Sequence, residues 1–575
     1  MYTEVKNMFS TESSTAMRGT FGLALAMFFA ATAAMSAPLQ QRPNILLIVA
    51  DDLGYSDLGV FGGEINTPNL DALAREGVAL RRFHAAPNCG PSRAATLTGV
   101  DFHRAGMGGN VEVVADNQKG LPAYQGKLRD DVVTFPELLR DGGYHTYMAG
   151  KWHMGKSARN MPGGRGFERS FALLNGGASH WADQLALVPN SKTVYTENDV
   201  VVEKLPDDFY SSTYYTDRII EFIEADLEDD APFFAYLAFT APHNPLHAPD
   251  ASIAKYKGVY DNGWDQLASN RLARQRKLGL LAEQVEPAAR PEWVLAWDQL
   301  SDEQKAQRAR DMEVYAAMID YLDESVGRVL SFLRSKGEYE NTMIVFISDN
   351  GPSKTSIADY VALGGAAADF VESFDNSLEN KGRPGSSTDI GPGWAFASAT
   401  PLRLFKGYVT QGGIQVPAII KPAGTVEAGA ALSQTPLHVT DLSPTFLALA
   451  EIDYPVEYKG VPIPRPAGQS MLPLIAKGDG GEKFSRGGLG WEAYGMDAWL
   501  EGDMKLVRLP VPYGNSQWQL YNLRSDPGET NDLAGKMPKL VAAFEAKWLD
   551  YARANEVVHP DKPIAYGKPV KPGKY

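Results

Sequence analysis

The sequence predicts an α/β fold: a large, mostly parallel but mixed sheet sandwiched by helices, followed by a smaller C-terminal α+β domain with an antiparallel sheet. Near-continuous apolar runs, such as Asn44–Ala50, have the pattern of strands that are buried on both faces. These runs alternate along the chain with segments of helical periodicity. After about residue 461 the pattern changes to short strands, turns and one closing helix.

The predicted elements follow in a regular order. After the strand Asn44–Ala50, a helix is predicted for "TPNLDALAREGV", with Leu70, Leu73 and Ala74 on one face. A helix, a glycine turn and a strand are predicted for "TFPELLRDGGYHTYMAGKWHMG". A helix "YYTDRIIEFIEAD" and a buried strand "APFFAYLAFTAPH" come next. One long helix or a helix pair is predicted for "ARDMEVYAAMIDYLDESVGRVLSFLRSKG", before the strand "NTMIVFISDNG".

Two segments interrupt this alternation, and the chain divides into three parts. Residues 251–310 are polar and predict a helical insertion, and residues 352–400, rich in Gly, Ala, Ser and Asp, predict a long loop region over the site. The predicted parts are an N-terminal extension with a signal peptide (1–37), a large α/β domain (38–460) and a C-terminal α+β domain (461–575). The last part contains the strands "DMKLVRLP" and "WQLYNL" and the helix "PKLVAAFEAKWLDYARAN".

The N-terminus indicates an exported protein, and the net charge argues against some classes of partner. Residues 19–34 are apolar, follow Arg18 and precede "TAAMSAP", which is typical of a signal peptide cleaved near residues 34–37. The run is too short for a comfortable transmembrane span, so we expect no stable membrane anchor and a periplasmic or secreted location. Translation from Met17 rather than Met1 would give the signal peptide a better start. A formal charge of −15 argues against nonspecific binding to nucleic acid or anionic membranes.

The chain has one cysteine, Cys89, which excludes an intramolecular disulfide. It opens the stretch "CGPSRAATLTG", where Pro91 suits the first turn of a helix and Gly99 suits its end. Cys89 is then expected at a helix N-terminus, which favours negative charge, with Arg93 within reach of the same turn. Two interpretations stay open at this point: a small buried apolar residue, or a nucleophile at an anion-binding helix end.

Polar residues follow three of the buried strands. They are Asp51 and Asp52, His243, and Asp349 and Asn350. Ligands of open parallel sheets bind beyond the carboxyl ends of the strands, so these side chains could meet at one edge. Carboxylate and amide oxygens favour Ca²⁺ or Mg²⁺ over zinc. For Asp51 and Asp52 taken alone, a helix cap or a turn is the alternative.

Three further segments carry candidate polar groups. Lys151 and His153, in "GKWHMG", point to the same side if that segment is extended. His243 and His247 lie in the proline-rich "PHNPLHAP". A run of glycine turns, "GYVTQGG", follows Lys406. Each of these signals is weak by itself.

Together these motifs resemble the type I sulfatases over nearly the whole mature chain. "CGPSRAATLTG" fits the family signature C-x-P-S-R followed by x-x-x-L-T-G, which is highly specific. The other family blocks are similar and occur in the family's order: "NILLIVADDLGYSDLG", "NTPNLDALAREGV", "AGKWHMG", "PHNPLHAP", "FISDNG" and "FKGYVTQGGIQVP". The insertion and "FDNSLENKGRPGSS" resemble bacterial periplasmic arylsulfatases in particular.

The resemblance implies an alkaline-phosphatase-like fold, sulfate ester hydrolysis and a set of residue roles. A formylglycine-generating enzyme would oxidise Cys89 to Cα-formylglycine, whose hydrate, a gem-diol, is the implied nucleophile. The implied Ca²⁺ ligands are Asp51, Asp52, Asp349, Asn350 and modified Cys89. The other implied catalytic residues are Arg93, Lys151, His153, His243 and Lys406, of which Lys151, His243 and Lys406 also bind substrate. Ser179 aligns with a serine that contacts the sulfate, and His180, Trp181 and His247 are candidates for the substrate pocket.

Three alternatives remain at the level of sequence. One is a phosphodiester or phosphonate monoester hydrolase of the same superfamily, and another is an unmatured sulfate- or glycan-binding protein. A two-zinc phosphatase ranks lower, because no second cluster of Asp and His pairs convincingly among the nine histidines. The sequence leaves open whether the substrate is an aryl, alkyl or carbohydrate sulfate, whether Mg²⁺ can replace Ca²⁺, and the oligomeric state.

Overall fold

A computed structural model of the chain describes residues 42–110, 113–355, 366–424, 434–477, 484 and 486–562. The predicted signal peptide, its cleavage site and both candidate start residues lie outside this range, as does the tail "KPVKPGKY". Within the described residues, no helix combines the length and the apolar character needed to cross a membrane.

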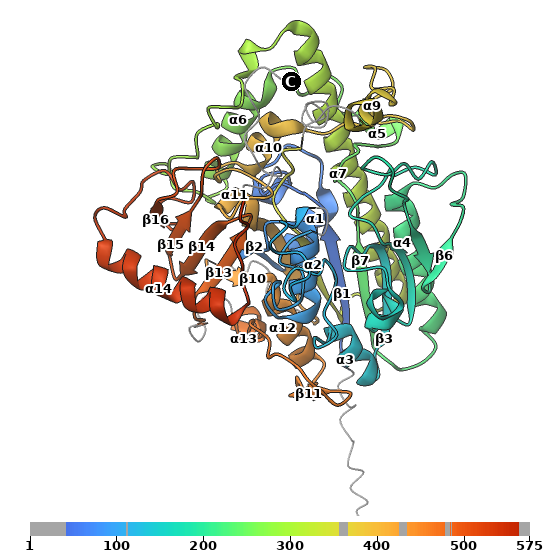
Figure 1. The fold of residues 1–575 in the computed structure, drawn as a ribbon. Helices are drawn as coiled ribbons and strands as arrows, with labels where there is room; N and C mark the ends of the chain where they lie inside the picture. Colours follow the sequence, from blue (N-terminus) through green and yellow to red (C-terminus); the bar gives the residue numbers. More distant parts are fainter. Residues whose placement is uncertain are drawn as a thin grey trace, which may run out of the picture. The chain divides into compact units, whose positions relative to one another are not determined.

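The central sheet has ten strands among the described residues, in the order β10–β2–β9–β8–β1–β7–β3–β4–β5–β6 (Figure 1). Their bounds are β1 Asn44–Ala50, β2 Val78–His84, β3 His145–Lys151, β4 Arg169–Leu173, β5 Tyr195–Glu197, β6 Val200–Val202, β7 Phe233–Ala238, β8 Thr342–Ser348, β9 Gln415–Lys421 and β10 Leu437–His438. The strands from β8 to β4 in this order run parallel, whereas β9, β5 and β6 pair antiparallel with their neighbours. The prediction of a mostly parallel, mixed sheet is confirmed.

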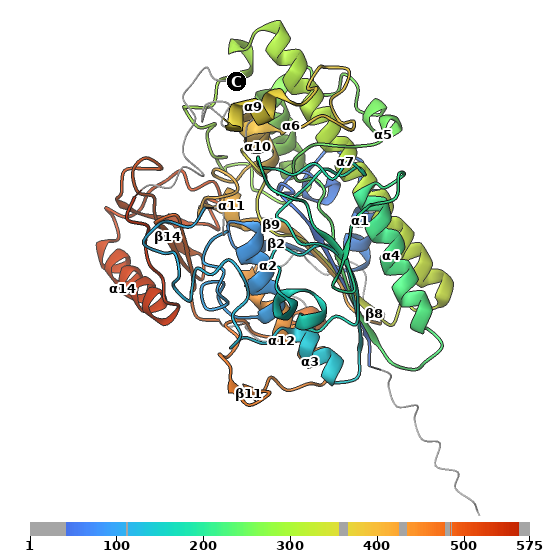
Figure 2. The ribbon, with the colours of Figure 1, turned by 45° about the vertical axis from the view of Figure 1, so that its right-hand side comes forward.

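Helices cover both faces of this sheet. Figure 2 shows α1, α4 and α7 on one side of the central strands and α2, α3 and α12 on the other. The helices span α1 Pro68–Glu76, α2 Cys89–Thr98, α3 Phe135–Asp141, α4 Ser211–Asp226, α5 Asp250–Ala254, α6 Gly263–Lys277, α7 Asp302–Lys336, α9 Ala366–Glu372, α10 Gly391–Ala399, α11 Gln411–Ile414, α12 Leu442–Leu449, α13 Leu472–Lys477 and α14 Pro538–Ala554. This layered arrangement is the predicted α/β class.

The long segment predicted as one helix or a helix pair is one helix, α7. It begins with a capping box between Ser301 and Gln304 and ends at Gly337, whose φ of 78° suits glycine. The predicted helical insertion contains α5 and α6. The segment 352–400 differs from the prediction of a long loop, because it also contains α9 and α10.

The glycines of α10 explain that difference, because they allow close packing rather than a loop. A Cβ placed on Gly393 would lie 2.5 Å from the ring of Trp264. The helix therefore packs its small residues directly against an indole, and its own Trp394 lies edge-on to the same ring. A composition rich in Gly and Ala signals a loop in the sequence but permits a tightly packed helix here.

The C-terminal region forms the predicted antiparallel sheet with a closing helix. Its four strands are β13 Leu489–Ala493, β14 Met496–Glu501, β15 Met504–Arg508 and β16 Trp518–Asn522, paired in sequence order. Helix α14 lies along this sheet (Figure 1). The predicted boundary between residues 460 and 461 falls in the turn of a small hairpin, β11 Glu457–Tyr458 with β12 Val461–Pro462, and stays a prediction.

A buried histidine joins the segment after α2 to the C-terminal sheet. The two ring nitrogens of His103 lie 3.0 Å from a carboxylate oxygen of Asp101 and 3.0 Å from one of Glu492 in β13. Tyr551 of α14 donates a hydrogen bond to Asp101 at 2.7 Å. Burial by itself would lower the pKa of His103, but the hydrogen bonds and charges of the two carboxylates raise it to about 9.

This arrangement predicts a specific pH dependence of stability. Because the pKa of His103 is raised from 6.5 in the unfolded chain, its contribution is fully present below pH 6.5 and is lost as pH rises through about 9. The His103→Gln variant should therefore lose less unfolding free energy than the wild type over this interval. Urea unfolding at several pH values measures both curves. Parallel curves would show that His103 is not the titrating group.

Candidate active site

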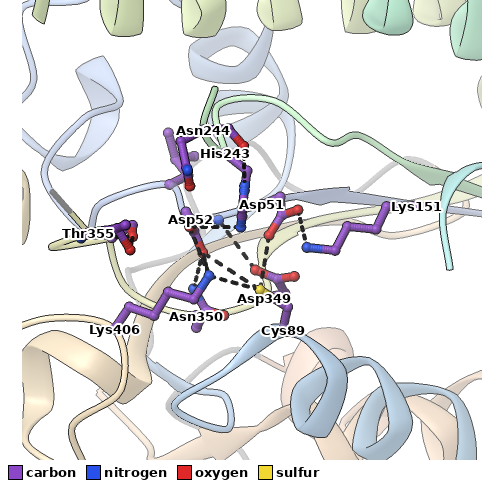
Figure 3. Close-up of polar contacts among 12 residues, drawn as sticks. Asp51, Asp52, Cys89, Lys151, His243, Asn244, Asp349, Asn350, Thr355 and Lys406 are labelled. Atoms are coloured by element: carbon purple, nitrogen blue, oxygen red, sulfur yellow. Dashed lines mark hydrogen bonds and ion pairs between the residues drawn. The ribbon is translucent and has the colours of Figure 1, made fainter. Parts of the chain in front are cut away.

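The carboxyl ends of the central parallel strands bring the predicted polar residues together (Figure 3). Asp51 and Asp52 follow β1, and Asp349 and Asn350 follow its neighbour β8. On the other side, β7 leads to His243 and β3 ends at Lys151. Because these strands run parallel, residues far apart in the sequence meet at one edge of the sheet.

Cys89 lies against this edge as the first residue of α2. All ten residues of α2 are buried, and Gly99 ends the helix in the left-handed conformation. The Cys89 Sγ atom lies 3.3 Å from Asp51 Oδ1, 3.8 Å from Asp52 Oδ1 and 3.0 Å from Lys406 Nζ. The helix thus directs its N-terminal residue to the carboxylates.

Three cationic side chains balance the three carboxylates. Lys151 Nζ lies 2.5 Å from Asp51 Oδ2, and Lys406 Nζ lies 2.7 Å from Asp52 Oδ1. Arg93 donates from Nε to Asp349 Oδ2 at 2.8 Å. All six side chains are nearly inaccessible to solvent. Pairing of this kind is what allows ionised groups to remain buried.

The chemistry of this cluster fits a divalent cation. One ligand atom each from Asp51, Asp52, Cys89 and His243 lies within 4.8 Å of the others. Asn350 donates from Nδ2 to Asp52 Oδ1 at 2.6 Å, while its buried Oδ1 has no hydrogen-bond partner among the described residues. A carboxylate-rich oxygen set favours Ca²⁺ or Mg²⁺. His243 was predicted at this edge of the sheet but was not among the implied metal ligands.

The electrostatics of the cluster disfavour a reactive thiolate. Burial and the charge of Asp51 raise the pKa of the Cys89 thiol well above its usual range. Burial alone would also raise the pKa of Asp51, but the charge of Lys151 and other nearby cations holds it below its ordinary value. Cys89 is therefore protonated at neutral pH, and its sulfur is a poor nucleophile in this environment.

His243 presents one nitrogen to the cluster. Its Nδ1 lies 2.6 Å from the carbonyl oxygen of Asn244, so this nitrogen carries a proton, and Nε2 lies 3.6 Å from Asp52 Oδ2. Burial lowers the pKa of His243 to about 4. The neutral ring therefore directs the lone pair of Nε2 towards the carboxylates.

Two glycines, Gly176 and Gly177, lie between His153 and His243. A Cβ on Gly176 would come within 2.8 Å of the His153 ring, and one on Gly177 within 3.2 Å of the His243 ring. His153 has a φ of 57°, and its Nδ1 is buried with no hydrogen-bond partner in the described part of the chain. Burial and then the charge of Lys151 lower the pKa of His153 well below its usual value, so the ring is neutral.

The other predicted pocket residues form a layer behind His243. His180 binds Ser211 Oγ at 2.7 Å and the carbonyl oxygen of His243 at 3.1 Å. Ser179 lies 3.4 Å from His247 Nδ1, and His247 Nε2 lies 2.9 Å from the Ser386 carbonyl oxygen. These contacts support the loop that carries His243. Sulfate contact by Ser179 and pocket roles for His180, Trp181 and His247 stay predictions.

The C-terminal region supports the site in a way that was not predicted from the sequence. Lys505 of β15 donates to the carbonyl oxygen of Val409 at 2.7 Å and pairs with Glu529 at 2.7 Å. Glu529 in turn accepts from the backbone of Gln411 at 3.1 Å. Both side chains are fully buried, and together they hold the segment that begins at Lys406. No local sequence pattern predicts these contacts, since Val409 and Gln411 lie about a hundred positions before Lys505 and Glu529 in the chain.

Comparisons with known proteins agree with this geometry. A sulfatase family model matches residues 43–452. An uncharacterized sulfatase of Schizosaccharomyces pombe is 41% identical over 540 residues, which cover 91% of this chain and 96% of that protein. An arylsulfatase of Klebsiella aerogenes is 40% identical over 420 residues, which cover 72% and 88%.

Solved structures share the fold. Ps i-CgsB superimposes with a TM-score of 0.64 at 25% identity, covering 91% of this chain and 95% of that one. The phosphonate monoester hydrolase of Agrobacterium radiobacter gives a TM-score of 0.53 at 18% identity, covering 89% and 96%, and shows the fold alone. Fold and site thus define a hydrolase of the alkaline-phosphatase-like class. Within that class, the chain belongs to the sulfatase family and is a sulfuric ester hydrolase.

The buried pair of Lys505 and Glu529 predicts a large loss of stability when one charge is removed. Lys505→Met leaves the Glu529 carboxylate buried without its cation, and we expect unfolding free energy to fall by about 3–5 kcal/mol. Adding Glu529→Gln should recover much of the loss, because the amide oxygen can still accept from Gln411.

Urea unfolding measures these changes. Lys119→Met, which removes an exposed partner of Asp116, should change the unfolding free energy very little, because water screens this pair. An equally small loss in Lys505→Met would contradict the structural role of the buried pair.

Proposed function

We propose that the enzyme hydrolyses aryl-type sulfate esters to a phenol or alcohol and inorganic sulfate. In this proposal the nucleophile is Cα-formylglycine made from Cys89, and the metal is Ca²⁺. The observation that carries it is the position of the only cysteine, whose protonated sulfur lies 3.3 Å from Asp51 and 3.0 Å from Lys406. The 40% identity to an arylsulfatase supports the substrate type.

The residues that would hold Ca²⁺ are Asp51, Asp52, Asp349 and Asn350, with the modified residue 89. The Oδ1 of Asn350, which has no hydrogen-bond partner in the described part of the chain, supports this choice, because a buried amide oxygen without a hydrogen bond is costly unless it binds a ligand. With three carboxylates matched by three cations, bound Ca²⁺ would add two positive charges, and the single negative charge of a sulfate ester would offset part of this excess. Metal and sulfate are therefore expected to bind together.

The formylglycine hydrate would supply a hydroxyl nucleophile, and a bound metal would supply positive charge for the sulfuryl oxygens. Cationic side chains of the protein would also supply positive charge at this site. Lys406 Nζ already contacts both residue 89 and Asp52, so it can reach a group bound between them. Lys151 lies on the opposite side, on Asp51, and Arg93 holds Asp349 in place. These fixed charges stabilise the developing negative charge without rearrangement.

The two histidines suit different proton transfers. A bound sulfuryl anion next to His243 favours its protonated form, in which Nε2 can donate to the leaving oxygen. The neutral ring of His153, with no partner on Nδ1 in the described part of the chain, can accept a proton. We assign His243 to leaving-group protonation, aided by Lys406, and His153 to the proton transfer that releases sulfate.

The remaining parts of the proposal concern partners and location. Ps i-CgsB has been crystallised with k-i-k-neocarrahexaose, and another neighbour with D-glucosamine-2-N,6-O-disulfate. A carbohydrate sulfate is therefore included among the candidate substrates beside small aryl sulfates. Maturation requires a formylglycine-generating enzyme. The predicted signal peptide supports export to the periplasm.

The Cys89 peptide provides the direct test. Mass spectrometry of active protein should find the aldehyde or its hydrate at position 89, and Cys89→Ala should abolish hydrolysis of an aryl sulfate. A thiol in protein of full activity would refute the formylglycine mechanism, and a thiol in inactive protein would favour the binding alternative. Faster cleavage of an aryl phosphodiester than of the matched aryl sulfate would favour the phosphodiester or phosphonate hydrolase.

Loss of His153 should separate the two halves of the reaction. We expect His153→Ala to release about one equivalent of phenol per active site in a burst and then to stall, because the step that frees sulfate lacks its proton acceptor. Stopped-flow absorbance of a chromogenic aryl sulfate measures the burst. Rapid multiple turnover without a burst would contradict the assigned role.

A further inference from the structure

Asp52, one of the proposed metal ligands, has an unusual backbone conformation. Its φ is 67°, a region that non-glycine residues seldom adopt and that has an energetic cost. Its side chain binds Lys406 and Asn350, and its backbone N–H donates to Asp349 Oδ1 at 3.3 Å. A strained residue at a site persists only when neighbouring contacts hold it.

The loop from Leu53 to Asp57 provides these contacts. Leu53 donates from its backbone to Ser348 Oγ at 3.0 Å, and Gly54 donates to Asp57 Oδ2 at 2.8 Å. A Cβ on Gly54 would lie 2.6 Å from both Asp57 Oδ2 and the Ser398 carbonyl oxygen. The loop therefore closes tightly on the Asp57 carboxylate, directly behind Asp52.

Two side chains from other elements bind that carboxylate. Tyr315 of α7 has one hydroxyl proton and two acceptors, Asp57 Oδ2 at 2.8 Å and the Asp52 carbonyl oxygen at 3.2 Å. Arg271 of the inserted helix α6 contacts Asp57 Oδ1 at 2.5 Å. Arg271 also makes two bonds of 2.8 Å to Glu64, which fix the guanidinium from its other side.

Burial makes this network rigid. Arg271 and Asp57 are fully buried, and Tyr315 has 1% of its surface exposed. In such surroundings water cannot take the place of a lost hydrogen-bond or ion-pair partner, so each side chain of the network keeps one arrangement. The insertion of residues 251–310, which the catalytic chemistry does not use, thus reaches the loop that follows a metal ligand.

We propose that Tyr315 and Arg271 are positioning residues that hold Asp52 in its strained conformation, ready to bind the divalent cation. The inference depends on the proposed metal site. Residues that orient ligands in this way typically change metal affinity 10- to 100-fold when they are removed. Tyr315 and Arg271 act through the network behind the site, since neither side chain makes a hydrogen bond to Cys89.

The variant Tyr315→Phe tests this proposal with little change in volume. Calcium titration of metal-stripped full-length protein by calorimetry should show about tenfold weaker binding than the wild type. Tyr256→Phe is the matched control. Tyr256 is also buried, donates to a carboxylate, Asp320, at 3.0 Å and accepts from the backbone of Asn66 at 3.1 Å, but it has no recorded contact with the loop 53–57.

The outcomes are distinct. Weaker Ca²⁺ binding in Tyr315→Phe, with unchanged binding in Tyr256→Phe and similar thermal stability of the two metal-free variants, supports the proposal. Equal affinity of Tyr315→Phe and the wild type, or an equal loss in both variants, would overturn it while leaving the metal site intact. A wild type that binds no Ca²⁺ would refute the proposed metal and this inference together. Arg271→Met, if it folds, should weaken binding at least as much.

Discussion

The pairing of buried opposite charges at the sheet edge is the constraint on which the rest of the structure depends. Asp51, Asp52 and Asp349 are held out of water, where an isolated carboxylate would be prohibitively unstable. Each is paired with a cation from a different element: Lys151 from β3, Lys406 from the segment before β9 and Arg93 from α2. The site therefore exists only when these distant elements are correctly assembled.

This requirement explains why so much of the chain converges behind one small cluster. The helix α2, which is buried along its whole length, brings Cys89 and Arg93 to the strand ends. The C-terminal sheet reaches the same region twice, through Lys505 on the Lys406 segment and through Trp491, which donates to the carbonyl oxygen of Ala85 at 2.9 Å. A backbone hydrogen bond also links these two segments, since the Gly407 N–H donates to the Pro87 carbonyl oxygen at 2.8 Å.

Much of this organisation could be predicted from local sequence patterns. Apolar runs with polar ends gave the strands β1, β7 and β8, and the parallel topology then implied that Asp51 and Asp349 meet. The support behind the site could not be predicted in the same way. Arg271 and Lys505 lie in polar or alternating segments that are typical of a solvent-exposed face, and only the tertiary structure shows that they are buried with an acidic partner. Similarly, the glycines of α10 signalled a loop because the sequence does not show Trp264 packed against them.

The same electrostatics bear on why a thiol at position 89 would be converted to another group. A thiolate would add a fourth negative charge beside Asp51 and Asp52, and burial with these neighbours raises its pKa accordingly. A hydrated aldehyde carries hydroxyl groups that are neutral until the reaction begins, so it can lie among the carboxylates without that penalty. Loss of a hydroxyl proton would place negative charge there only as the reaction begins, next to Lys406 and the proposed metal site, where fixed positive charge would be most effective. The buried charge pattern thus favours a neutral precursor and a charged transition state.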